Sequence, residues 1–235
     1  MKSMAVLERG ADGTGPAASA FAAGFGRDPE RGLIAFASQL GLAITDDQVE
    51  TMLRFLDMLY SANESLNLTR VPRETAHVRH LMESLAVLGA VPVASGSRIL
   101  DLGSGGGLPG VPLAIAVPEC RFVLMDARMK KVAFLESVIE TLSLGNACAV
   151  HARAEDAGRD ASMRHAFDLV VARAVAPLGQ LVSWVEPFLT RSGVCAAMKS
   201  RAIDDEITAA RGRLDELGLD IHGLERLAIP GQDAE

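Results

Sequence analysis

Residues 98–107 read Arg98-Ile99-Leu100-Asp101-Leu102-Gly103-Ser104-Gly105-Gly106-Gly107, and this stretch decides the fold. The apolar run at 98–102 predicts a short strand, and the glycine run at 103–107 predicts a sharp turn into a helix. Glycines carry no Cβ, so their backbone can approach a ligand closely. In open α/β sheets, ligands bind beyond the carboxyl ends of the strands, where the strand order reverses. We therefore expect this turn to hold a ligand.

The chain after Pro92 alternates between strands and helices. A helix should follow the glycine turn as far as about Val117, and the helix at 130–144 carries apolar residues on one face. Strands separated by helices of about ten to fifteen residues are typical of a parallel, doubly wound sheet. We therefore predict an α/β, Rossmann-like fold with a mostly parallel sheet. Further strands are expected at 122–126, 147–151, 167–172 and 194–198, and further helices at 177–190 and 203–217.

The region before Pro92 divides in two. Residues 1–30 are rich in Ala and Gly and contain too little apolar bulk to offset the entropy of ordering, so we predict a disordered tail. Residues 31–92 predict a helical N-terminal extension. Its clearest signal is Thr45-Asp46-Asp47-Gln48, which has the form of a capping box and precedes apolar residues at helical spacing. The Rossmann-like domain is then expected at 93–235.

Two acidic residues narrow the choice of ligand. Asp101 stands two residues before the first glycine, where a dinucleotide-binding turn usually has an apolar residue. A carboxylate there is unfavourable for a pyrophosphate but suits the ammonium group of a methionine moiety. Asp126 ends the next predicted strand, where a carboxylate can accept hydrogen bonds from the ribose hydroxyls. The pair favours S-adenosyl-L-methionine over NAD as the cofactor.

The charge of the chain restricts its partners. A formal net charge of −7 argues against indiscriminate binding of nucleic acids, which needs a basic field. Local basic clusters are still present, although solvated helix faces and loops are their ordinary interpretation. The clusters are Arg70, Arg73 and Arg79, with His77 and His80 among them, and Arg128, Lys130 and Lys131.

Other classes of protein are disfavoured by what the sequence lacks. No apolar run is long enough to cross a bilayer, and Glu8 and Arg9 interrupt the apolar run at the N-terminus, so no signal peptide is expected. We therefore expect a cytoplasmic protein. Cys120, Cys148 and Cys195 are far apart and form no CxxC pair, so neither a disulfide framework nor a metal site is expected. Nothing demands more than a monomer.

Several motifs resemble the RsmG (GidB) family, whose members methylate N7 of a guanine in the 530 loop of 16S ribosomal RNA. The resemblance runs from about Leu40 to about Ile229. Its most specific part is the long turn, in which Leu108-Pro109-Gly110-Val111-Pro112 follows the glycines directly. The resemblance implies a class I S-adenosylmethionine-dependent methyltransferase that acts on 16S rRNA or the small ribosomal subunit. Further matching residues are Asn67-Leu68-Thr69, Arg79-His80-Leu81, Asp126, Lys131 with Phe134-Leu135, Arg153 with Glu155, and Ala172-Arg173-Ala174.

The resemblance also implies roles for individual residues. Leu108 would contact the cofactor from the glycine turn, Ala154 and Glu155 would lie beside the adenine, and Arg173 would lie at the cofactor or target edge of the pocket. With the ribose-binding carboxylate, the expected cofactor-binding residues are Gly103, Gly105, Leu108, Asp126, Ala154, Glu155 and Arg173. The helices before residue 90 would help to hold the RNA, and we predict phosphate contacts from Arg70, Arg73, Arg79, Arg128 and Lys131.

The proposed chemistry assigns no catalytic residue. Guanine N7 carries a lone pair and no proton, so its methylation needs no general base. Positioning for in-line transfer can supply much of the acceleration. The target base must be exposed, so a loop or a flipped-out nucleotide is expected.

This sequence departs from the family pattern in several places. The family normally ends in a further antiparallel strand after the segment near 221–229, and this sequence stops at Glu235 without it. Its absence would leave an unpaired sheet edge. The other departures are Ser61-Ala62 where a tryptophan often precedes Asn63, Glu83 in place of a common aspartate, and Ser200 where glycine is usual.

Three alternative functions remain open. A small-molecule methyltransferase would share the cofactor site and differ only in its acceptor. A nicotinamide-dependent oxidoreductase would bind NAD instead of S-adenosylmethionine. A non-catalytic RNA-binding or assembly protein would keep the fold without turnover, and the missing strand is the feature that supports this alternative.

Overall fold

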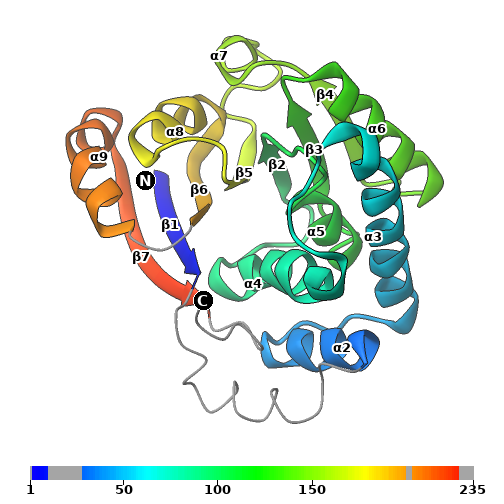
Figure 1. The fold of residues 1–235 in the computed structure, drawn as a ribbon. Helices are drawn as coiled ribbons and strands as arrows, with labels where there is room; N and C mark the ends of the chain where they lie inside the picture. Colours follow the sequence, from blue (N-terminus) through cyan, green and yellow to red (C-terminus); the bar gives the residue numbers. More distant parts are fainter. Residues whose placement is uncertain (1, 10–27, 200–202, 228–235) are drawn as a thin grey trace.

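Seven strands form one sheet in the computed structural model, which describes residues 2–9, 28–199 and 203–227. The order is β4-β3-β2-β5-β6-β1-β7, and the pairings are parallel. The order reverses between β2 and β5, near the middle of the sheet (Figure 1). The strands are β1 (Lys2–Arg9), β2 (Arg98–Leu102), β3 (Arg121–Asp126), β4 (Ala147–His151), β5 (Phe167–Arg173), β6 (Leu189–Lys199) and β7 (Leu219–Leu227).

The predicted Rossmann-like, doubly wound fold is confirmed. In β2, every residue after Arg98 is buried, as expected for a parallel strand with helices on both faces of the sheet. The strands predicted at 98–102, 122–126, 147–151 and 167–172 lie where β2 to β5 are found. β6 begins earlier than predicted, because it continues back through Leu189 to the end of the preceding helical segment.

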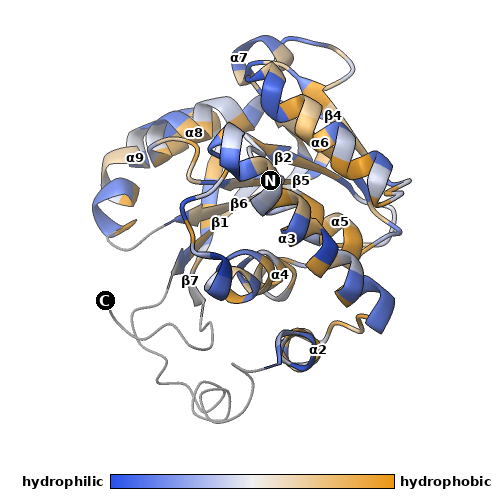
Figure 2. Cartoon of the chain, turned by 45° about the vertical axis from the view of Figure 1, so that its right-hand side comes forward, coloured by the Kyte–Doolittle hydropathy of each residue, from blue (hydrophilic) through white to orange (hydrophobic). Residues whose placement is uncertain are grey.

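Helices cover both faces of the sheet. On one face, α3, α5 and α6 share a hydrophobic core that includes Phe55, Val111 and Leu135. On the other face, α8 and α9 contribute Leu181 and Leu214 to a second core. Figure 2 shows that α3 and α6 carry both hydrophilic and hydrophobic residues, as expected for helices with one face on a core. The α-helices of the described ranges are α2 (Pro29–Gln39), α3 (Asp46–Leu66), α4 (Glu83–Ala90), α5 (Gly110–Ala116), α6 (Met129–Thr141), α7 (Ala154–Ala157), α8 (Leu178–Val185) and α9 (Ile203–Leu217).

The helices of the N-terminal extension begin as predicted but change type along the chain. The capping box is present, because Gln48 N–H donates to Thr45 Oγ1 at 3.2 Å and Thr45 N–H donates to Gln48 Oε1 at 2.8 Å. The helical segment that follows Pro72 is not one continuous helix. It consists of a 3₁₀ turn, η2 (Arg73–Thr75), a π-helical turn, η3 (His77–Met82), and then α4.

The prediction of a disordered tail at 1–30 is wrong for residues 2–9. These residues form β1, which pairs in parallel with β6 on one side and with β7 on the other. Met4, Val6 and Leu7 are fully buried. Residues 10–27 lie outside the described part of the chain.

The expectation of an unpaired sheet edge is also wrong for β6, because β1 pairs with it. β6 does not end the sheet, because Val194 to Lys199 align with Ser3 to Glu8. The prediction of a disordered tail used the average composition of thirty residues. That average does not reveal the short apolar run at residues 2–9, which pairs with strands at the other end of the chain. None of the helices in the described ranges is sufficiently long and apolar to span a membrane.

Candidate functional site

A pocket opens at the carboxyl ends of β2 to β5, beside the point where the strand order reverses. Its volume is about 350 Å³, within the range of about 300–1,000 Å³ that small-molecule sites occupy. Four of the predicted cofactor-binding residues, Gly103, Asp126, Ala154 and Glu155, line this pocket together. The other residues that line it are Leu102, Met125, Ala127, Arg128, Lys131, Ala152, Arg153, Ala174, Val175 and Trp184.

The glycine turn after β2 is held against β3. The backbone N–H groups of Gly103 and Ser104 both donate to the carbonyl oxygen of Met125, each at 2.9 Å. Gly103 and Gly105 have φ values of 73° and 60°, a left-handed conformation that favours glycine. A Cβ at Gly103 would also lie 2.9 Å from Cγ2 of Val175. The turn therefore leaves backbone, without side chains, at this wall of the pocket.

Asp101 lies beneath the turn and does not line the pocket. Its Oδ2 accepts hydrogen bonds from Ser104 Oγ at 2.6 Å and from Gly110 N–H at 2.9 Å. Burial raises the pKa of this carboxyl to about 6. Its Oδ1 is buried without a hydrogen-bond partner in the described ranges. Asp101 is 0% exposed, so it fastens the turn from beneath and does not reach the pocket, where the sequence suggested that it would meet an ammonium group. The positive charge that acts on its carboxyl, and lowers its pKa against the effect of burial, is that of Arg173.

Asp126 ends β3 and is oriented by two backbone groups. Its Oδ2 accepts from Gly105 N–H at 3.0 Å, and its Oδ1 accepts from Arg128 N–H at 2.8 Å. An ionised carboxylate has about four lone-pair sites, so both oxygens keep capacity for further donors. This arrangement fits a ribose, whose hydroxyl groups would bind a carboxylate that is already fixed in place.

The two predicted RNA-binding residues of the second basic cluster both line the pocket. Lys131 Nζ lies 4.0 Å from Asp126 Oδ2, and its side chain is only 20% exposed. Arg128 is exposed and lies at the N-terminal end of α6. The structure therefore places Lys131 with the cofactor pocket, and Arg128 at its rim.

Two other predicted cofactor-binding residues are not among those that line the pocket. Leu108 is 4% exposed and belongs to the hydrophobic core that α3 and α6 share. Gly105 reaches the site through its N–H group, which holds Asp126. Leu108 therefore packs behind the turn, whereas Gly105 supports the pocket through Asp126.

Arg173 also lies outside the pocket lining, although it ends β5. Its Nη1 donates to the carbonyl oxygen of Arg79 at 3.2 Å and lies 3.7 Å from Glu83 Oε2. The next residues, Ala174 and Val175, line the pocket instead. Ala174 has a φ of 55°, a conformation that is uncommon for a residue with a Cβ and concentrates at functional sites. This turn sends Arg173 to the N-terminal extension and Val175 to the pocket.

The predicted RNA-binding arginines of the N-terminal extension have different surroundings. Arg70 and Arg73 are exposed, and Arg79 is partly exposed. Arg73 pairs with Asp57 and lies over the ring of Tyr60, 5.5 Å from its centre. The cluster is therefore not a uniform solvated face.

The fold brings several residues to the site that no sequence motif marks. Trp184 reaches the pocket from α8, and Val175 reaches it from the turn after β5. His80 was grouped with solvated basic residues, yet it is 1% exposed. Its neighbour Leu81 is also buried, so apolar spacing around His80 was the signal that could have revealed its burial.

Comparisons with known proteins agree with this architecture. The family model for rRNA small subunit methyltransferase G (GidB) matches residues 48–225. Ribosomal RNA small subunit methyltransferase G of Thermoanaerobacter sp. (strain X514) is 35% identical over 202 residues, which cover 86% of this chain and 84% of that protein. The protein of the same name from Roseiflexus castenholzii is 39% identical over 203 residues, covering 85% of each chain.

One solved structure shows the same fold at low sequence identity. The cyclase SpnF superposes with a TM-score of 0.51 at 16% identity, covering 73% of each chain. The family match, by contrast, spans α3, the glycine turn, the pocket and most of β7. On this evidence of sequence, the chain belongs to the rRNA small subunit methyltransferase G (GidB) family.

Proposed function

We propose that this chain transfers a methyl group from S-adenosyl-L-methionine to N7 of a guanine in the 530 loop of 16S ribosomal RNA. The observation that carries the proposal is the pocket at the strand reversal, lined by Gly103, Asp126, Ala154 and Glu155. It occurs in a family whose curated members are named ribosomal RNA small subunit methyltransferase G. The substrate would be 16S rRNA or the small ribosomal subunit.

The pocket residues suit the three parts of this cofactor. Asp126 would accept hydrogen bonds from the ribose hydroxyls, and Ala154 and Glu155 would lie beside the adenine. The backbone at Gly103 suits the methionine end, and Asp101 supports that turn from beneath. Bound S-adenosyl-L-methionine supplies an activated methyl group on a sulfonium, so the protein has mainly to hold and orient the reactants.

The acceptor side needs orientation rather than proton transfer. Guanine N7 has no proton to remove, which is why the proposal assigns no general base. A methylated N7 leaves positive charge on the base, so cations of the protein should contact O6 or phosphates instead of N7. Arg70, Arg73, Arg79 and Arg128 are the exposed or partly exposed candidates for phosphate contacts, and of these Arg73 is paired with Asp57.

Two of the alternative functions lose support. The non-catalytic alternative rested on an open sheet edge, and β1 pairs with β6 along that edge. A nicotinamide-dependent oxidoreductase is disfavoured by the family match. A small-molecule methyltransferase would use the same pocket and is separated from the proposal by its acceptor.

The test is transfer of a radiolabelled methyl group from S-adenosyl-L-methionine to small-subunit particles from cells that lack this modification. We expect label in 7-methylguanosine at one site. Enzyme that has been treated with EDTA and then freed of the chelator should transfer the methyl group unchanged, because the proposal needs no metal ion, and the active species should behave as a monomer. Cofactor binding without label in any RNA would overturn the proposed acceptor.

A further inference from the structure

The arginines of the N-terminal extension differ in how they are held. The guanidinium of Arg73 is engaged by Asp57 and Tyr60. Arg70 is exposed and makes no hydrogen bond or ion pair to another residue in the described ranges. Arg79 differs from both, because a buried carboxylate holds one side of its guanidinium.

Glu83 is the carboxylate that fixes Arg79. Nε of Arg79 donates to Oε1 of Glu83 at 3.0 Å. The side chain of Glu83 is 3% exposed, whereas that of Arg79 is 34% exposed. The two terminal amino groups of Arg79 bond to none of the residues that the structure describes. A guanidinium held at Nε and open at its terminal groups presents a fixed fork, which matches the geometry of a phosphate.

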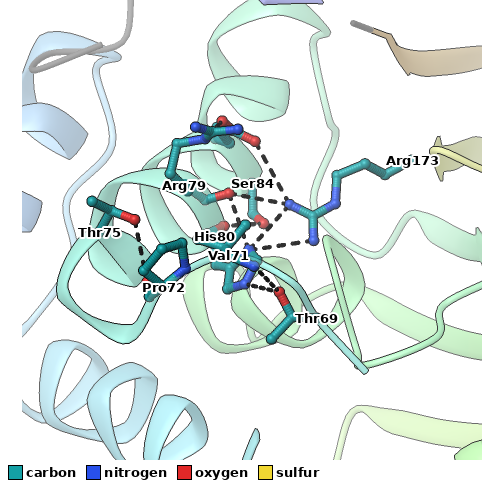
Figure 3. Close-up of polar contacts among 9 residues, drawn as sticks. Thr69, Val71, Pro72, Thr75, Arg79, His80, Ser84 and Arg173 are labelled. Atoms are coloured by element: carbon teal, nitrogen blue, oxygen red, sulfur yellow. Dashed lines mark hydrogen bonds and ion pairs between the residues drawn. The ribbon is translucent and has the colours of Figure 1, made fainter. Parts of the chain in front are cut away.

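The backbone of Arg79 is tied to the strand that borders the pocket. Its carbonyl oxygen accepts a hydrogen bond from Nη1 of Arg173 at 3.2 Å (Figure 3). Arg173 ends β5 and is followed directly by Ala174, which lines the pocket. Arg79 itself lies in η3, a π-helical turn, and such turns are frequent at functional sites. Arg79 is therefore held at a defined place relative to the pocket.

His80 fixes the same turn from a second side. Its Nε2 lies 2.9 Å from Thr69 Oγ1, which also accepts from Val71 N–H at 3.1 Å. Its Nδ1 lies 3.1 Å from the carbonyl oxygen of Arg79 and 3.5 Å from both terminal nitrogens of Arg173. Both ring nitrogens are therefore engaged by the protein, and His80 is a positioning residue.

The loop that carries Thr69 also contacts the glycine turn. A Cβ on Gly106 would lie 3.2 Å from Cβ of Leu68, so the two backbones are in close contact. Through Leu68, Thr69 and His80, the turn with Arg79 is connected to the glycine turn as well as to β5.

We infer that Arg79 binds a phosphate of the RNA beside the target guanine, and that Glu83, His80 and Arg173 position it. The inference rests on the proposed function and deepens it. Two arginines share Glu83 as a carboxylate partner, so Glu83 gathers two guanidinium groups at this edge of a chain whose formal net charge is −7. Phosphate contacts fix the register of a nucleic acid on a protein, so this contact would set where the guanine meets the pocket.

The experiment measures binding of an RNA fragment that contains the target guanine, at several salt concentrations. Arg79→Ala should weaken RNA binding about ten- to a hundredfold, because a charge-assisted hydrogen bond is lost. It should also reduce the slope of log K against log salt by about 0.7–1, with the affinity for S-adenosyl-L-methionine unchanged. Arg79→Lys should keep the salt slope and only part of the affinity, since it keeps the charge without the fork.

Arg121→Ala is the matched control, because Arg121 is exposed at the amino end of β3, the opposite edge of the sheet. It should change neither affinity nor slope. Glu83→Gln tests positioning: it keeps every positive charge and hence the salt slope, while kcat falls about tenfold as the guanidinium loses its fixed orientation. If the wild type methylates RNA but Arg79→Ala behaves like Arg121→Ala, the inference is overturned and the proposed function stands. If the wild type binds the cofactor and labels no RNA, the proposed function itself fails.

Discussion

At the scale of single residues, Asp101 shows how burial changes the pKa of a carboxyl group. Its pKa is raised to about 6, chiefly by desolvation, against hydrogen bonds from Ser104 and Gly110 that lower it. The folded state therefore holds a proton between pH 3.8 and about 6 that the unfolded state has lost. Stability from this group is present below the lower pH and is lost as pH rises through the window.

We predict that Asp101→Asn gains stability relative to the wild type as pH rises. The amide does not titrate, so the difference in free energy of unfolding should grow by roughly 1 kcal/mol between pH 5 and pH 8. Urea unfolding at both pH values measures it. A difference that stays constant with pH would mean that Asp101 keeps an ordinary pKa.

A second residue-scale prediction concerns Asp126. Asp126→Ala should weaken binding of S-adenosyl-L-methionine about ten- to a hundredfold, because bonds to a charged acceptor are lost. The variant also frees the N–H groups of Gly105 and Arg128, which Asp126 holds. Calorimetry measures the affinity, with Glu140→Ala, an exposed acid of α6, as the control. Equal affinities for the two variants would remove Asp126 from the site.

At the scale of elements, β1 is the strand that joins β6 to β7. Its residues alternate between the two faces of the sheet, so Leu7 packs in the core with α3 and Met4 and Val6 pack in the core with α8. A parallel strand buried on both faces contributes apolar burial on each side. In this chain, β1 fills the place between β6 and β7.

We therefore predict that Met4→Ala destabilises the protein by about 2–5 kcal/mol, the cost of a cavity in a core. Urea unfolding should show it. The matched control is Leu224→Ala on β7, whose side chain is 38% exposed and whose replacement should cost under about 0.5 kcal/mol. A Met4→Ala protein as stable as the wild type would show that residues 2–9 contribute nothing to the sheet.

At the scale of the whole molecule, the N-terminal extension and the glycine turn share one core. A Cβ on Gly106 would lie 2.8 Å from Cδ1 of Leu59 and 3.2 Å from Cβ of Leu68. Leu59 belongs to α3, and Leu68 belongs to the loop that precedes the Arg79 turn. The extension is therefore part of the same packed unit as the cofactor pocket.

Gly106→Ala should accordingly disturb stability and cofactor binding together. Overpacking of this contact should cost about 1–3 kcal/mol, and the affinity for S-adenosyl-L-methionine should fall with it. Gly212→Ala in α9 is the control, because no atom lies within 4 Å of its added Cβ and alanine favours a helix by about 0.5–1 kcal/mol. Retained stability and cofactor affinity in Gly106→Ala would mean that the extension and the turn are not coupled.

Part of this protein could be predicted from local patterns. The alternation of short apolar runs with helical spacing identified β2 to β5 and the doubly wound fold, because hydrophobic periodicity is a local property. The turn at 103–107 and the acid at the end of β3 marked the pocket, since the carboxyl ends of parallel strands meet at one edge. Motif resemblance gave the family, which the match over 48–225 confirmed.

Other features depended on contacts between distant parts of the chain. β1 is too short to be recognised alone and becomes a strand by pairing with residues 194–199 and 219–227. Arg173 was expected at the cofactor or target edge of the pocket, but it pairs with Glu83, ninety residues away in sequence. The chain turns at Ala174, directly after Arg173. Local spacing determines which segments become strands and helices, whereas the burial of Asp101, the partners of Arg79 and the place of β1 are set by the packing of the whole chain.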